Sequence, residues 1–121
     1  MKLLAHLFVG LVAAEHLYFL WLEMFAWETQ GKKVFRHSLP EHLFAPTRRL
    51  AANQGLYNGF LAAGLIWTFF IGDPLWQFYI RVFFLFCIIV AGVYGAISAS
   101  KKIVYVQALP ALVALVLLHL R

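Results

Sequence analysis

Residues 50–98 read LAANQGLYNGFLAAGLIWTFFIGDPLWQFYIRVFFLFCIIVAGVYGAIS, which is two long apolar runs on either side of a Gly72-Asp73-Pro74 break. Each run reaches the roughly 20 residues that a helix needs to cross a bilayer. Glycine frees the backbone at the break, and proline cannot continue a helix. The stretch therefore predicts two antiparallel membrane-spanning helices, 50–71 and 75–98, joined by a short turn.

The flanking segments extend the same pattern. Further apolar runs cover 3–27 and 103–120, and a polar loop at 28–49 separates the first run from the second. Of the 121 residues, 64% are hydrophobic and 12% are charged, so a water-soluble domain of this size could not bury its apolar surface. We predict an all-α fold, a four-transmembrane-helix antiparallel bundle. It forms a single integral membrane domain over 1–121, with the lipid bilayer as its partner.

The first apolar run allows a second interpretation. Lys2 precedes a short apolar stretch, and Val12-Ala13-Ala14 resembles the small-residue cleavage site of a signal peptide. The apolar character continues to Trp27, however, which is the length of a span rather than of a signal sequence. We therefore favour a retained first span.

Lysine and arginine gather mainly between the apolar runs, which makes the net charge of +5 a topology signal rather than a sign of a nucleic-acid partner. On one side of the four-span arrangement lie Lys32, Lys33, Arg36, Arg48, Arg49, Lys101 and Lys102, and on or near the other lie Lys2, Arg81 and Arg121. The positive-inside rule places loop 28–49 in the cytoplasm and both termini outside. Tryptophans near span ends, including Trp27 and Trp76, fit interfacial anchors.

Ionisable side chains at membrane depth are the main functional lead. In the first span, Glu15, His16 and Glu23 lie within about a quarter turn of one another at helical spacing, whereas His6 points the opposite way. A charge at the bilayer centre costs about 2.5–3.5 kcal/mol on insertion scales. Glu15 is therefore expected to be protonated, paired or beside water. Simple hydrogen bonding between helices is the alternative role for these groups.

The second span opens on a polar run beside small residues. Gly55 and Gly59 are spaced to let another helix approach closely. Tyr94 in the third span and Gln107 in the fourth lie at a similar depth, so we predict a polar pocket open toward the cytoplasm. The candidate ligand-binding residues are Glu15, His16, Glu23, Asn53, Gln54, Tyr57, Asn58, Tyr94 and Gln107. In the fourth span, Pro110 removes the usual partner of the Val106 carbonyl and predicts a bend.

Motifs for common chemistry are absent from the sequence. It carries no phosphate loop, no nucleophile elbow and no metal-type His/Cys spacing, and Cys87 is its only cysteine. We predict no metal and no cofactor, and the sequence leans against an enzyme without deciding the question.

The run Asn53-Gln54-Gly55-Leu56-Tyr57-Asn58-Gly59, taken with Glu15, Tyr94-Gly95, Gln107 and Pro110, resembles a family of small bacterial four-helix membrane proteins of unknown function. Some of its members are labelled "epimerase". The resemblance covers essentially the whole chain. It implies a multi-pass location in the bacterial cytoplasmic membrane, and it supplies no catalytic residues.

Three functions remain open from the sequence. The first is binding or transport of a small amphipathic or cationic molecule by a homodimer or larger homo-oligomer, with Glu15 and Glu23 as the proton or cation site. The second is an intramembrane acid–base isomerase or epimerase of a lipophilic substrate, using Glu15 with His16 or Glu23 with Tyr57. The third is a structural or assembly subunit of a membrane complex.

Overall fold

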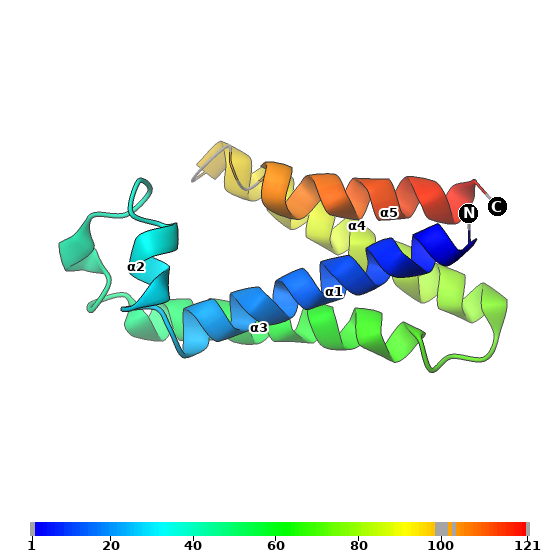
Figure 1. Ribbon diagram of the computed structural model, residues 1–121, viewed down its shortest axis with the longest axis horizontal. Coiled ribbons are helices and arrows are strands. Elements are labelled where there is room, and N and C mark those ends of the chain that lie inside the picture. The colour runs from blue at the N-terminus through cyan, green and yellow to red at the C-terminus, as the bar shows by residue number, and fades with distance from the viewer. Residues whose placement is uncertain (1, 99–101, 103, 121) are drawn as a thin grey trace. The chain divides into compact units, whose positions relative to one another are not determined.

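The computed structural model describes residues 2–98, 102 and 104–120, and all regular elements in these ranges are helical (Figure 1). In chain order they are α1 (Lys2–Met24), α2 (Gln30–Val34), the 3-10 turn η1 (Glu41–Leu43), α3 (Arg48–Thr68), α4 (Pro74–Ser98), the π-helical segment η2 (Val104–Ala108) and α5 (Leu109–His119). The all-α prediction is confirmed for the described part of the chain. Ile103, at the start of the predicted fourth span, and Lys101 and Arg121, in the topology argument, lie outside the described residues.

The break between α3 and α4 falls where the sequence predicted it. The Asp73 carboxylate accepts hydrogen bonds from the backbone N–H groups of Leu75 (2.9 Å) and Trp76 (3.1 Å), as an N-cap does. Pro74 follows at the first helical position, where its missing N–H removes no helical hydrogen bond. The turn is therefore specified locally, by a cap and a proline.

Two helices among the described residues, α1 and α4, are long and apolar enough to cross a membrane. The 21 residues of α3 are sufficient in length, but Asn53, Gln54 and Asn58 make that helix less apolar. The apolar helix Tyr105–His119 is shorter than a usual span. Two of the four predicted spans thus meet the criteria for length and composition.

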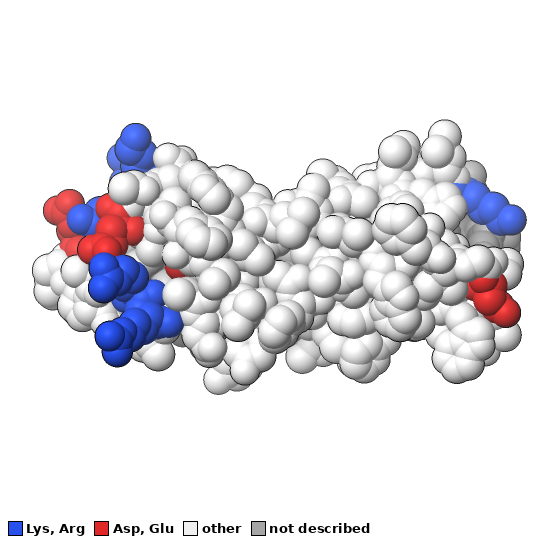
Figure 2. All heavy atoms as spheres, turned by 90° about the horizontal axis from the view of Figure 1, so that it is seen from below, with Lys and Arg blue, Asp and Glu red and all other residues white. Residues whose placement is uncertain are grey.

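Most of the face drawn in Figure 2 belongs to residues other than Lys, Arg, Asp and Glu. Large apolar side chains are well exposed on both candidate spans, as in Leu3 (71%) on α1 and Ile97 (81%) on α4. Such exposure is unfavourable in water and ordinary in lipid.

The chain divides into two compact units, one formed by Met1–Ala14 with Leu61–Arg121 and the other by Glu15–Phe60. The single domain over 1–121 stays a prediction. In the first unit, apolar residues from several helices form the core: Ala5, Val9, Val12, Ala13, Leu65, Leu85, Ile88, Ala111, Ala114, Leu117 and Leu118. Gly92 is buried in this unit, and a Cβ there would lie 2.8 Å from the Ala108 Cβ, so α4 and η2 touch at backbone distance.

The predicted bend at Pro110 stays a prediction, but the turn directly before it is π-helical. Segment η2 immediately precedes α5, and Pro110 occupies one of the first two positions of α5. A π-helical turn widens the backbone and changes the hydrogen-bonding pattern, which accommodates the missing proline donor. Lateral packing continues past the proline, because Ala111 and Ala114 belong to the core of the unit.

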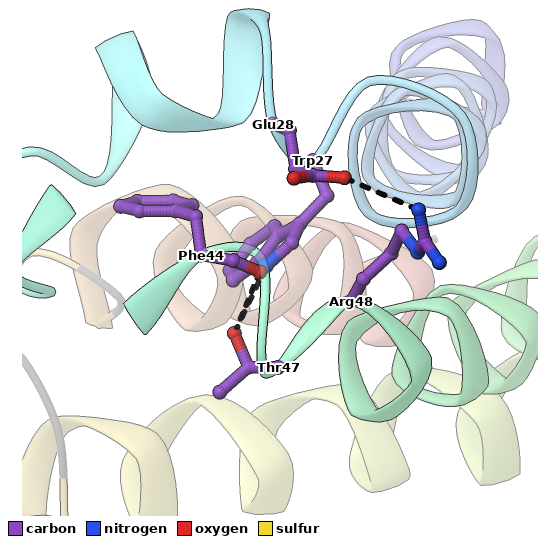
Figure 3. Close-up of polar contacts among 5 residues, drawn as sticks. All are labelled: Trp27, Glu28, Phe44, Thr47 and Arg48. Carbon is purple, nitrogen blue, oxygen red and sulfur yellow. Dashed lines mark hydrogen bonds and ion pairs between the residues drawn. The ribbon is translucent and has the colours of Figure 1, made fainter. Parts of the chain in front are cut away.

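In the second unit, the segment between α1 and α3 is folded around an aromatic cluster (Figure 3). The Trp27 ring lies 5.0 Å from the Phe44 ring and 5.5 Å from the Phe35 ring, and Phe44 is 1% exposed. The indole N–H of Trp27 donates to the Thr47 hydroxyl at 3.1 Å, and Glu28 and Arg48 form an ion pair at 3.6 Å beside it. Trp27, predicted as an interfacial anchor, is half-buried and packs in this aromatic cluster.

Candidate functional site

Most of the predicted ligand-binding residues lie in the unit Glu15–Phe60. They are Glu15, His16 and Glu23 on α1 and Asn53, Gln54, Tyr57 and Asn58 on α3. Tyr94 on α4 and Gln107 in η2 belong to the other unit. The site described below is therefore confined to α1 and α3 of one unit.

A short hydrogen bond between Glu23 and Asn58 joins the two helices. The Asn58 amide donates to Glu23 Oε1 at 2.6 Å, and Glu23 is only 6% exposed. The close approach of the backbones makes this contact feasible, because a Cβ at Gly55 would lie 3.0 Å from the Glu23 Cβ. The predicted role of Gly55 in close helix packing is confirmed.

Glu15 and His16 lie two turns earlier on α1. His16 is fully buried, and its ring meets the edge of Phe19 at 5.2 Å between centroids. One carboxyl oxygen of Glu15, Oε1, is buried without a hydrogen-bond partner among the described residues. A buried carboxyl oxygen in that state carries a proton or requires a cation, a donor or water beside it.

The remaining polar residues of α3 do not share this burial. Asn53 and Gln54 are exposed, and Tyr57 is 58% exposed with its ring against Phe60. At about 100° per residue, Asn58 lies about 60° from Gly55, whereas Tyr57 lies about 160° away. The glycine side faces α1, so Asn58 is the amide turned toward Glu23. Binding by Asn53, Gln54 and Tyr57 stays a prediction.

The structure adds a polar cluster that the sequence analysis missed, and it lies in the other unit. Arg81 on α4 is 1% exposed; its Nε donates to the Thr68 hydroxyl at 2.9 Å, and its guanidinium lies 4.6 Å from the Phe69 ring centroid. Arg81 also contacts His6 Nδ1 at 2.8 Å, and the Gln77 amide donates to the Thr68 carbonyl at 2.9 Å. The available signal was an arginine inside an apolar run, which was counted only as a topology charge.

Thr68 is the central residue of this cluster. It is the last residue of α3 and is fully buried. Its hydroxyl donates to the Leu65 carbonyl at 2.6 Å and accepts from Arg81. The hydroxyl and the carbonyl of one residue therefore tie the end of α3 to Arg81 and Gln77 at the beginning of α4. No group of three His, Cys, Asp or Glu residues within the described ranges could hold a metal ion.

Comparison with known proteins gives a family without an assigned activity. "Uncharacterized protein YpaA" from Lactococcus lactis subsp. lactis (strain IL1403) is 34% identical over 107 residues, which cover 88% of each chain. No solved structure matches the chain. The family model described as "Protein of unknown function (DUF1304)" matches residues 10–119, and the chain therefore belongs to this family.

Proposed function

We propose that this chain is a multi-pass membrane protein that binds a small cationic or amphipathic molecule, and transports it, at the carboxyl groups of α1. The observation that carries the proposal is Glu23, which is 6% exposed and bonded at 2.6 Å to Asn58. A neutral amide orients a carboxyl group without neutralising its charge, so a proton or a ligand cation is needed to complete the site. The buried Oε1 of Glu15 is a second such group on the same helix.

The topology that belongs to this proposal has four spans and outward-facing termini. Helix α3 is about 32 Å long at 1.5 Å per residue, which is enough to cross the hydrocarbon core. The π-helical segment η2 and α5 together supply the fourth span. Lys32, Lys33 and Arg36 in the loop between α1 and α3 favour the cytoplasmic side for that loop.

Thiol labelling of intact cells tests this topology. Cys87 is first replaced by serine, and single cysteines are then introduced as Lys2→Cys and His37→Cys. We expect a membrane-impermeant maleimide to label Lys2→Cys in intact cells and His37→Cys only after lysis. Labelling of both positions in intact cells, or of His37→Cys alone, would contradict the proposed topology.

Binding of ethidium, a lipophilic cation, to the full chain in lipid nanodiscs tests the site. We expect saturable binding measured by fluorescence anisotropy and a loss of affinity of about tenfold in Glu23→Gln, because that change removes the charge and leaves the size unchanged. Glu41→Gln is the matched control, since the Glu41 side chain is 85% exposed in the loop. Binding that does not saturate, or that has equal affinity in the parent protein, Glu23→Gln and Glu41→Gln, would contradict the proposed function.

A structural or assembly role is the second candidate. It is favoured by the exposure of Asn53, Gln54 and Tyr57 on one helix that is otherwise largely apolar. Polar side chains directed at lipid are costly, and hydrogen bonds to a partner's helix would satisfy them. The intramembrane isomerase stays a prediction from the sequence, with Glu15, His16 and Glu23 as its acid and base groups.

A further inference from the structure

A cavity of about 160 Å³ lies in the unit formed by Met1–Ala14 and Leu61–Arg121. The Glu23–Asn58 pair belongs to the other unit and contributes nothing to its lining. Its polar lining comes from Lys2 and His6 on α1 and from Gln77 and Arg81 on α4. Leu117 and Leu118 of α5 contribute to its apolar lining. The described lining holds two cationic side chains and no carboxylate, so the cavity favours an anion.

Arg81 is held in a defined orientation at this cavity. Its Nε donates to the Thr68 hydroxyl, and its guanidinium packs on the Phe69 ring, so the side chain does not need to be ordered when a ligand arrives. A guanidinium has no acceptor atom, so Arg81 Nη1 donates to His6 Nδ1 in their 2.8 Å contact. The proton of a neutral His6 ring then sits on Nε2, which makes His6 a further hydrogen-bond donor in the lining.

The position and size of the cavity limit what it can hold. Arg81 lies seven residues from the beginning of α4, or about 10 Å along the helix axis, which places it in the outer part of the hydrocarbon region of a spanning helix, within reach of the headgroups for a long side chain. A cavity of about 150 Å³ is known to accommodate benzene. The cavity therefore suits a headgroup-sized anion with a few carbon atoms rather than a whole lipid.

We propose that this cavity binds a phosphate group, with Arg81 as the central ligand, Lys2 as a flexible second cation and the His6 Nε2–H as a third donor. Arginine presents several N–H donors in a fixed plane that matches phosphate oxygens. The two leucines of the lining, Leu117 and Leu118, accept the first carbons attached to that phosphate. An anionic phospholipid and a free phosphate ester share this chemistry.

Native mass spectrometry of the full chain tests the proposal with phosphatidylglycerol, phosphatidylcholine and inorganic phosphate as probes. We expect a phosphatidylglycerol adduct that survives detergent removal and is at least tenfold more abundant than the phosphatidylcholine adduct. Competition by millimolar inorganic phosphate would indicate a site that also takes free phosphate, whereas resistance to it would indicate a lipid site. Equal adducts with both lipids and no phosphate adduct would overturn the proposal.

Variants assign the adduct to the cavity. We expect Arg81→Gln to reduce it at least tenfold, and His6→Phe to reduce it severalfold while keeping an aromatic ring near Phe69. Arg49→Gln is the matched control, because Arg49 is exposed on α3. Circular dichroism checks the helical fold of each variant. If Arg81→Gln unfolds, the adduct of His6→Phe still tests the cavity. An unchanged adduct in the folded cavity variants would overturn the proposal without affecting ethidium binding at Glu23.

Discussion

Replacing Trp27 with alanine is expected to lower the free energy of unfolding by about 3 kcal/mol or more. The indole packs against the Phe35 and Phe44 rings and donates to the Thr47 hydroxyl, so its removal leaves a cavity and loses one hydrogen bond in the loop between α1 and α3. Figure 3 shows Trp27 with Phe44 and Thr47. Titration with SDS in mixed micelles, followed by circular dichroism, measures this change. The loss should appear as an earlier unfolding midpoint.

The control for this prediction is Trp76→Ala. Trp76 is 60% exposed at the beginning of α4, and its backbone N–H bond to Asp73 does not depend on its side chain. We expect a change within about 1 kcal/mol for this variant in detergent. Equal losses for Trp27→Ala and Trp76→Ala would show that the loop has no aromatic core and that both residues act alike.

Replacing Gly55 with leucine is expected to cost about 3 kcal/mol, at the upper end of the range for overpacking, and to abolish the Glu23–Asn58 hydrogen bond. A Cβ at this position would lie 2.8 Å from the Met24 Cγ and 3.2 Å from the Leu20 carbonyl oxygen. The carbonyl belongs to the α1 backbone and cannot move aside without moving the helix. The same SDS titration measures the stability, and loss of ethidium binding would report the separation of Glu23 from Asn58.

Gly72→Leu is the matched control for Gly55→Leu, because a Cβ at Gly72 meets nothing within 4 Å. We expect this variant to unfold within about 1 kcal/mol of the parent protein and to bind ethidium normally. If Gly55→Leu were as stable as Gly72→Leu, the close packing of α1 against the beginning of α3 would be wrong. The proposed site would then lose its geometric basis.

Much of the fold was predictable because its signals are local. The Gly72-Asp73-Pro74 turn contains its own cap and its own helix breaker, so the break between α3 and α4 follows from neighbouring residues. The loop core was not predictable in this way. Phe35 and Phe44 are separated from Trp27 by turns whose combined geometry decides whether the three rings meet, so position near a span end suggested an anchor instead.

The candidate site was predictable only in part. Spacing along a helix placed Glu23 on one face of α1 and a polar run beside the small residues of α3, but it did not identify Asn58 as the partner of Glu23. Which amide meets a carboxyl group depends on the rotation of both helices about their axes. The Arg81 cluster was missed for the same reason, because His6, Thr68 and Arg81 come from three different helices.

The amino-acid sequence by itself determined an all-helical chain, the places where its helices break, and an apolar composition suited to lipid, because composition, periodicity and breakers act over a few neighbouring residues. Only the tertiary structure decided that Asn58 bonds to Glu23, that the Trp27 ring packs against Phe44 and that Arg81 is buried beside a cavity. These contacts join residues far apart in the chain, and they depend on how closely the helices approach and which faces they turn toward one another.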